Sequence, residues 1–246
     1  MPPRDFELLP QPCQVSYYNY LIDDQKVTCE TDEESNTLII SNLLLDPYVY
    51  EEDQTIEFSI LDIKMPSSTR MTGEYKIEFL DNIEGEYKLV DTTAVYDKIR
   101  GLPGELDTIS ITPQVNQTDT EDTFDFEVKL SHAILQGGYL EIYFPEELYF
   151  TRNADCPLFG DSFDQKSVGC RFDIDRNMVT VTGGFPDGDY QELDKPLKFS
   201  VHGIFTQRSM KATSNFKFVT YDKDGWQIDK HGTFFLGPML AAKTIT

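Results

Sequence analysis

Alternation of apolar and polar residues is the clearest pattern in the second half of the chain. Between residues 123 and 130 every second side chain is apolar, the apolar residues being Phe124, Phe126, Val128 and Leu130. A period of two places these side chains on one face of a strand and the charged residues between them on the other. Such alternation is typical of a strand in an antiparallel sheet that has one buried face.

Similar segments follow one another through this half of the chain, separated by clusters of Gly, Asp and Pro such as 183–189. They predict strands at 108–115, 123–135, 138–144, 177–181, 197–205, 214–222 and 225–236. Seven short strands in about 130 residues, with no helical period, predict an immunoglobulin-like antiparallel β-sandwich.

The pattern repeats itself at an offset of 141 residues: residues 29–81 align with 170–222 without a gap, and twelve of the 53 positions are identical. The later strands of the first copy are predicted at 37–40, 55–65, 74–81 and 86–96. Because this period far exceeds that of solenoid repeats, it indicates a string of domains. We therefore expect an all-β protein of two tandem immunoglobulin-like domains, residues 1–100 and 101–240, with 241–246 opening a further repeat or forming a tail.

The two copies differ at their beginnings. Three strand-like segments precede Cys156, whereas only twelve residues precede Cys13. The first domain is therefore expected to lack its opening strands. Two explanations fit: the chain is a stretch of a longer array, which the commonness of such arrays favours, or a neighbouring molecule supplies the strands by donor-strand complementation. The linker at 97–107 has two Gly and one Pro, which suits domains held in a fixed string.

The cysteines form two local pairs, Cys13 with Cys29 and Cys156 with Cys170. Four cysteines allow three connectivities, and the repeat selects the one in which each domain closes its own loop. We expect two disulfides, each pinning a loop on a connection rather than tying the two sheets together. Disulfides place the protein in an extracellular or lumenal compartment. A zinc site is not expected, because the pairs are not C-x-x-C and no histidine is near them.

The excess of acidic over basic residues affects which classes of partner the protein can bind. The chain carries 43 acidic and 21 basic residues, a net charge near −22. This charge repels nucleic acid and anionic lipid, and leaves divalent cations or a basic partner as alternatives to a plain solvated surface. No run of 18 apolar residues occurs, so no membrane insertion is expected of this segment.

Catalytic chemistry is not indicated. No G-x-S-x-G, H-E-x-x-H, P-loop or dinucleotide motif is present, and there are three histidines in the chain. His202 aligns with Leu61 of the first copy, which favours packing over catalysis. We expect no enzyme activity and no organic cofactor.

Calcium is the one cofactor that the acidic loops leave open. Asp222, Asp224 and Asp229 lie in a segment that begins D-x-D-G like a calcium loop. Calcium needs six to eight oxygens, which this run does not supply alone. Asp-Gly between two strands is also a strong hairpin-turn signal. We favour the hairpin, with no metal bound.

The sequence Asn116-Gln-Thr118 is an N-glycosylation sequon in a polar stretch just after a predicted strand. A glycan could be accommodated there. The expectation that Asn116 is modified depends on the extracellular assignment.

The joint pattern of the second copy resembles the tandem extracellular domains of large ciliate surface proteins. The resemblance rests on Phe144-Pro, the Cys156–Cys170 spacing, N-x-V-x-V from Asn177, L-x-F-x-V-x-G-I ending at Ile204, and T-S-N-F-x-F-x-T-Y-D ending at Asp222. It covers both copies, the first more weakly. It implies domains strung along the cell or ciliary surface, without catalytic residues.

These observations predict a structural or adhesive component of an extracellular array or filament. Its partners would be copies of itself or adjoining repeats of the same polypeptide. The alternative is a module that binds a glycan or a protein through loops at one end of the sandwich. The aromatic residues that would serve it are Tyr17, Tyr18, Tyr20, Phe159 and Phe163. The competing interpretation is that these aromatics pack beneath the cysteine loops.

Overall fold

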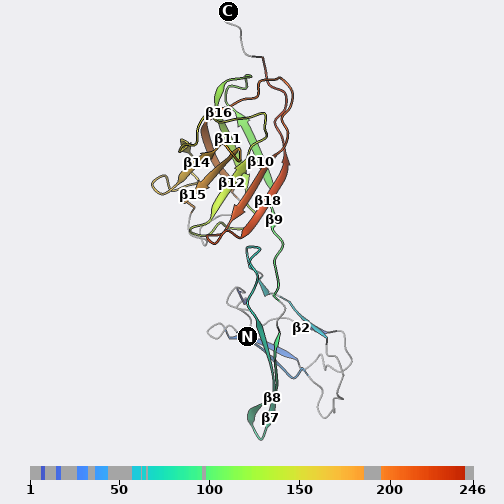
Figure 1. Ribbon diagram of the computed structural model, residues 1–246. Helices are drawn as coiled ribbons and strands as arrows, with labels where there is room; N and C mark the ends of the chain where they lie inside the picture. The colour runs from blue at the N-terminus through green and yellow to red at the C-terminus, as the bar shows by residue number, and fades with distance from the viewer. Residues whose placement is uncertain are drawn as a thin grey trace, which may run out of the picture. The chain divides into compact units, whose positions relative to one another are not determined.

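The protein is described by a computed structural model, in which every regular element within the described residues is a β-strand (Figure 1). The described residues are 7–8, 15–17, 27–32, 37–43, 57–61, 63–64, 66–95, 98–185 and 195–241. They include no helix long and apolar enough to cross a membrane. The chain divides into two compact units: residues 1–66 with 70–101, and residues 67–69 with 102–246. The predicted all-β class is confirmed.

The second unit contains a four-stranded antiparallel sheet. Its strands, in spatial order, are β10 (Thr108–Pro113), β11 (Glu121–Lys129), β16 (Leu197–Phe205) and β13 (Leu158–Phe159). In β11 the observed burial follows the alternation in the sequence. Phe124, Phe126 and Val128 are buried, and the residues between them are partly exposed. The strand ends at Lys129, six residues before the predicted limit of 135.

The facing sheet has six strands. In spatial order they are β14 (Gly169–Asp173), β15 (Met178–Thr182), β12 (Tyr139–Tyr143), β17 (Phe216–Tyr221), β18 (Gln227–Phe234) and β9 (Gly104–Glu105). All neighbours are antiparallel except β9, which runs parallel to β18. The central strand β17 pairs with β12 on one edge and β18 on the other.

Phenylalanine rings join the two sheets into a sandwich. Phe126 of β11 stacks on Phe199 of β16, with ring centroids 5.1 Å apart. The same ring meets Phe218 of the opposite sheet edge-on, at 6.3 Å between centroids. Aromatic pairs of this geometry add about 0.5–1.5 kcal/mol each beyond the burial of their apolar surface. The core predicted from the alternation is therefore the core of the second unit.

The segment that links the two copies is part of the second unit. Gly104 and Glu105 form β9 against Asp229 and Lys230 of β18, and Leu106 is buried in the core. The Leu106 N–H donates to the carbonyl of Lys230 at 3.1 Å. The linker is thus an edge strand rather than a tether.

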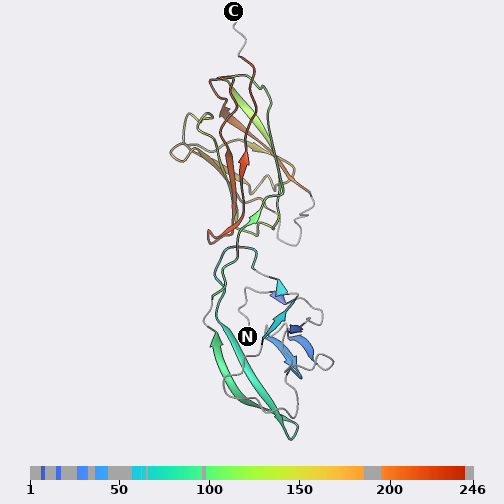
Figure 2. The ribbon, with the colours of Figure 1, turned by 90° about the vertical axis from the view of Figure 1, so that its right-hand side faces the viewer.

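In the first unit the described strands form four antiparallel pairs. They are β1 (Glu7–Leu8) with β6 (Ile63–Lys64), β2 (Val15–Tyr17) with β5 (Phe58–Ile60), β3 (Thr28–Asp32) with β4 (Thr37–Ser41), and β7 (Tyr75–Ile83) with β8 (Glu86–Val95). Figure 2 shows β7 and β8 as a long twisted ribbon. Glu84 and Gly85 turn the chain with φ of 54° and 87°. Two successive positive φ values define the tight turn that matches strand twist.

One sequence expectation about the cysteines is wrong in part. Cys170 does not lie on a connection but in β14, where it is paired with Val181 of β15. Only two side chains of this strand, Cys170 and Phe172, are buried. A five-residue strand with two buried positions gives too short an alternation to be recognised.

Candidate interaction site

The cysteine pair of the second unit is bonded. Cys156 and Cys170 form a disulfide across a separation of 14 residues, with Cα atoms 5.1 Å apart. The Cys156 N–H also donates to the carbonyl of Cys170 at 2.9 Å. The bond therefore fixes the segment that leads into β13 against the edge strand β14.

The cysteine pair of the first unit is only partly within the described residues. Cys29 is buried in β3 and is disulfide-bonded. Cys13 lies outside the described residues. The pairing of Cys13 with Cys29 stays a prediction.

The glycosylation sequon lies in the connection between β10 and β11. Asn116 is exposed and has φ of 52°, a left-handed conformation that Asn tolerates. Its carbonyl accepts a hydrogen bond from the N–H of Leu240 at 3.2 Å. The backbone is therefore held in place while Asn116 itself is exposed, an arrangement compatible with a glycan.

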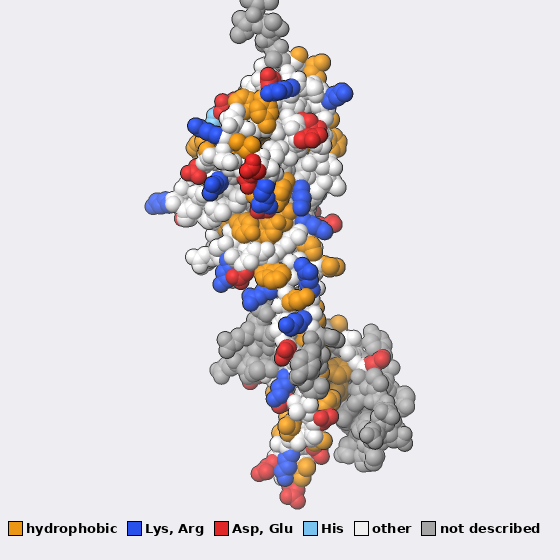
Figure 3. All heavy atoms as spheres, viewed as in Figure 1, with side chains coloured by type: hydrophobic (Ala, Val, Ile, Leu, Met, Phe, Trp, Pro, Cys, Tyr) orange, Lys and Arg blue, Asp and Glu red, His pale blue; other side chains and the backbone are white. Residues whose placement is uncertain are grey.

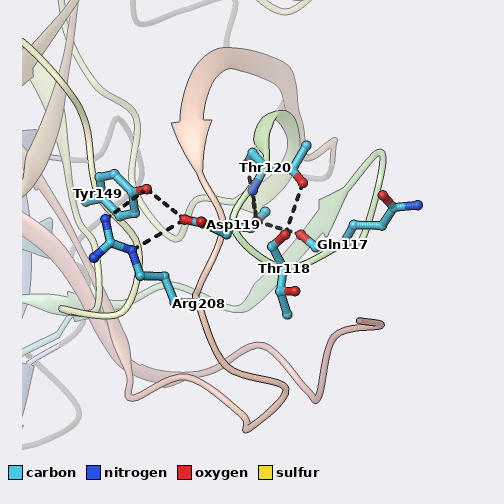
Figure 4. A network of polar contacts seen from close by, with 7 residues as sticks. Gln117, Thr118, Asp119, Thr120, Tyr149 and Arg208 are labelled. Carbon is cyan, nitrogen blue, oxygen red and sulfur yellow. Dashed lines mark hydrogen bonds and ion pairs between the residues drawn. The ribbon is translucent and has the colours of Figure 1, made fainter. Parts of the chain in front are cut away.

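A polar network holds this connection (Figure 4). The Tyr149 hydroxyl donates to Asp119 Oδ1 at 3.0 Å, and Arg208 Nε donates to the same oxygen at 3.4 Å. The Arg208 guanidinium lies 5.1 Å from the centroid of the Tyr149 ring. Thr206 Oγ1 accepts from the Thr120 N–H at 2.9 Å. In these contacts the polar groups of Asp119, Tyr149 and Arg208 are paired with one another. Together they hold the loop that carries the sequon.

Asp222 and Asp224 lie in the β17–β18 turn. Asp222 Oδ1 accepts hydrogen bonds from the N–H groups of Asp224 at 3.0 Å and Trp226 at 2.8 Å. Gly225 has φ of 82°, which closes the turn. One oxygen of the Asp222 carboxylate thus accepts hydrogen bonds from backbone N–H groups of the same turn, as in an Asx turn.

Asp229 has a different environment. Its side chain is fully buried (0% exposed) in β18, and Oδ2 accepts from the N–H groups of Ser131 at 3.2 Å and His132 at 2.9 Å. Oδ1 lies 2.7 Å from His132 Nδ1. The three acidic residues considered as calcium ligands therefore belong to two separate local structures, the β17–β18 turn and the buried contact of Asp229 with residues 131 and 132. Among the described residues no group of three or more His, Cys, Asp or Glu side chains is arranged to hold a metal.

His202 does not pack in the core, contrary to the expectation from its alignment with Leu61. Its side chain is half exposed, and Nδ1 lies 2.9 Å from Thr123 Oγ1. Leu61, which directly follows β5, is also exposed. The alignment therefore paired two exposed positions rather than two buried ones.

The loop aromatics divide into two groups. Phe163 is buried and contacts Phe185 and Phe199 edge-on, with centroids 5.2 and 5.5 Å apart, so it packs beneath the cysteine loop. Phe159 of β13 is exposed to 62%. Tyr17 belongs to β2, while Tyr18 and Tyr20 lie outside the described residues.

A tyrosine cluster that sequence reasoning missed covers the outer face of the six-stranded sheet. Glu141 of β12 is almost buried, and its Oε2 accepts from the Tyr143 hydroxyl at 2.5 Å. The Tyr139 and Tyr221 rings stack at 4.8 Å between centroids. Burial, and next the charge of Glu141, raise the pKa of the Tyr221 phenol. Arg176 lies beside the cluster, with Nη2 donating to the Tyr143 hydroxyl at 2.8 Å. Arg176 Nη1 also lies 3.7 Å from Glu141 Oε1, so the carboxylate has a cationic neighbour in this cluster.

Among the described residues, exposed apolar side chains are concentrated on the β7–β8 hairpin. Ile77 is 40% exposed, Phe79 38% and Tyr87 70%, and Leu80 and Leu89 are also exposed. In the space-filling view apolar and charged side chains interleave along this hairpin (Figure 3). Exposed apolar side chains on a strand pair are a feature that surfaces in contact with another chain often have.

No protein-family model and no curated protein sequence matches this chain. Among solved structures it is similar to the second type II cohesin module of the adaptor ScaA scaffoldin of Acetivibrio cellulolyticus, at 14% identity and a TM-score of 0.32, over 56% of this chain and 92% of that one. The type II cohesin dyad of the same scaffoldin aligns over 95% of this chain and 87% of its own, at 13% identity and a TM-score of 0.29. The full-length major pilin SpaD of Corynebacterium diphtheriae aligns over 52% of this chain and 34% of its own, at 13% identity and a TM-score of 0.33. Each similarity is weak and assigns neither function nor partner to this chain.

Proposed function

We propose that this chain is a non-catalytic structural or adhesive component of an extracellular array built from tandem immunoglobulin-like domains. The observation that carries the proposal is the linker between the two copies, which is built into the second unit as strand β9. A linker that belongs to a sheet suits repeats strung in a fixed series better than domains that act independently.

Contacts around β9 support this role for the linker. Besides its pairing with β18, Ser131 Oγ donates to the carbonyl of Glu105. A Cβ atom at Gly104 would lie 2.7 Å from His132 Nδ1, so the linker approaches this loop as closely as only glycine permits. Such contacts resist separation of the linker from the sheet.

The disulfide supports an extracellular location, because disulfides persist in oxidising compartments. Within that location we propose the cell surface, including the ciliary surface that the sequence resemblance implies, with Asn116 as a glycan acceptor. The partners are copies of this chain or adjoining repeats, and the net charge near −22 opposes contact with nucleic acid.

The second candidate function is recognition of a glycan or protein through the sandwich loops. One observation favours it, the exposure of Phe159 beside the disulfide. Phe159→Ala would abolish such recognition and leave array formation intact. The burial of Phe163 leaves this candidate with less support than the array.

Location tests the proposed function. Antibodies raised against residues 102–241 should label intact, non-permeabilised cells, and electron microscopy should place the label along extended surface material. Treatment with peptide:N-glycosidase should lower the mass of the native protein, and Asn116→Gln should remove this change. Label that appears only after permeabilisation would contradict the proposal.

A further inference from the structure

A groove lies beside the glycosylation sequon on the second unit. It is lined by residues 111–113 of β10, by residues 236–239, which follow β18, and by Asn116 itself. Its volume is about 260 Å³. We call it the sequon groove. The residue that would carry a glycan is therefore also a residue that borders an open space on the surface.

Backbone hydrogen bonds fix the segments that line the sequon groove. The Leu240 N–H donates to the carbonyl of Asn116 at 3.2 Å, and the Thr118 N–H donates to the carbonyl of Leu240 at 3.0 Å. On the other side, the Leu236 N–H donates to Thr213 Oγ1 at 2.9 Å, and the Thr213 N–H donates to the carbonyl of Leu236 at 3.0 Å. The groove is therefore formed before any ligand occupies it.

The lining of the groove is mainly apolar, and part of it is unfilled. Leu236 and Met239 are buried, whereas Gly237 and Pro238 are exposed. A Cβ atom added at Gly237 would have no heavy atom of the described residues within 4 Å. Apolar grooves that stay open to solvent often mark places where a ligand binds. The space in front of Gly237 is large enough for an additional group.

We infer that the sequon groove holds the first N-acetylglucosamine residue of a glycan carried by Asn116. The inference rests on the proposed function, in which Asn116 is a glycan acceptor. A sugar ring has C–H groups on its faces, which suit an apolar lining, and hydroxyl groups at its edge, which stay in water. Pockets for drug-sized ligands have volumes of about 300–1,000 Å³, so the smaller sequon groove suits a single sugar ring.

Covalent attachment removes the need for high intrinsic affinity. A sugar joined to Asn116 is presented to the groove intramolecularly, at the high effective concentration that a short linkage gives. A weak contact with the lining, such as that of a sugar ring with Pro113 and Pro238, is then enough to keep the ring in place. The bound sugar contacts both the β10–β11 connection and the segment after β18, so it stabilises the hydrogen bonds between them.

Two forms of residues 1–246 with the same sequence test this inference. One is secreted to a bacterial periplasm, where disulfides form and no glycan is attached. The other is secreted from a eukaryotic host and trimmed with an endoglycosidase that leaves one N-acetylglucosamine residue, which mass spectrometry locates on Asn116. The chain has one sequon, so any difference between the forms comes from this sugar.

Thermal unfolding, followed by the fluorescence of Trp226 in the second unit, measures the effect of the sugar. We expect the form with one sugar to have a Tm higher by about 2–4 °C. This is the shift that one additional contact as strong as a typical hydrogen bond produces in a domain of this size. Hydrogen exchange at the Leu240 N–H should also be slower in this form.

A glycine substitution fills the groove. Gly237→Leu should reduce the gain in Tm from the sugar to below about 1 °C, because the leucine side chain takes the place of the ring. Gly232→Leu is the matched control: a Cβ there also meets nothing within 4 Å, but Gly232 does not line the groove, so the gain should persist. Each variant is compared with and without the sugar, so that the direct effect of the substitution on stability cancels.

Nuclear Overhauser effects locate the ring itself. The N-acetylglucosamine protons should show contacts with Pro238 and Met239 in the wild-type chain and lose them in Gly237→Leu. Three results would overturn the inference: equal Tm with and without the sugar, a gain in Tm that survives Gly237→Leu, or contacts of the sugar outside residues 236–239.

Failure of this inference can be told apart from failure of the proposed function. A sugar on Asn116 that does not contact the groove would overturn the inference alone. Absence of any sugar from Asn116 would overturn both the inference and the role of Asn116 as a glycan acceptor. The surface location of the protein is tested separately by antibody labelling of intact cells.

Discussion

Removal of the Asp229 carboxylate should destabilise the second unit more than any other single carboxylate substitution in the β17–β18 hairpin. Asp229→Ala leaves the part-buried N–H groups of Ser131 and His132 without the carboxylate oxygen that accepts from both. An unsatisfied buried donor costs about 1–3 kcal/mol, and because these two are only part-buried we expect about 2–3 kcal/mol for the pair. The His132 ring loses its partner as well.

The expected effect is large enough to measure by chemical unfolding. The single Trp, Trp226, lies in the second unit and reports its unfolding by fluorescence. With a shift of about 2–4 °C per kcal/mol for a domain of this size, a loss of about 2–3 kcal/mol in Asp229→Ala should lower Tm by about 4–12 °C. Asp229→Asn should lower it less, because the amide oxygen still accepts one hydrogen bond.

Asp161→Ala is the matched control, since Asp161 is an exposed carboxylate of the same unit. It should change the free energy of unfolding by no more than about 0.5 kcal/mol, as surface substitutions usually do. If Asp229→Ala unfolds at the same denaturant concentration as Asp161→Ala, the assigned role of Asp229 as the anchor of the 131–132 loop is refuted.

Three further predictions concern the linker, the first cysteine pair and calcium. Gly104→Val should make the linker cleavable after Glu105 by a glutamate-specific protease, because a side chain there collides with groups packed against β9, whereas Gly232→Val, where a Cβ meets nothing within 4 Å, should not. Non-reducing peptide mapping should recover a Cys13–Cys29 bridge, and a free thiol or an interdomain bridge would argue against an oxidising compartment. Millimolar calcium should leave Tm nearly unchanged; a rise equivalent to about 2.7 kcal/mol, lost in Asp222→Asn, would instead make calcium part of the function.

Strands with long alternation could be predicted from the sequence. Residues 197–205 of β16 were predicted to the residue, and β12, β15, β17 and β18 were predicted within two residues at each end. The start of β11 was predicted within two residues, and its end was predicted six residues too late. In each of them the apolar side chains face one shared core, so local pattern and tertiary packing agree. Where the local pattern and the tertiary packing agree in this way, strands can be predicted from the sequence.

Elements fixed by long-range contacts could not be predicted. Strand β9 consists of Gly104 and Glu105, which carry no apolar signal and are a strand only because β18 lies beside them. Asp229 looked like a calcium ligand because carboxylates in acidic loops suggest one. Its actual partners, Ser131 and His132, are 98 and 97 residues away in sequence, and no local pattern connects them.

The central claim is that this chain is a component of an array whose partners are copies of itself or adjoining repeats, and the mass of the particle in solution tests it most directly. Light scattering should show residues 1–246 associating into species whose mass rises with concentration. A monodisperse monomer of residues 1–246 at every concentration would contradict the account.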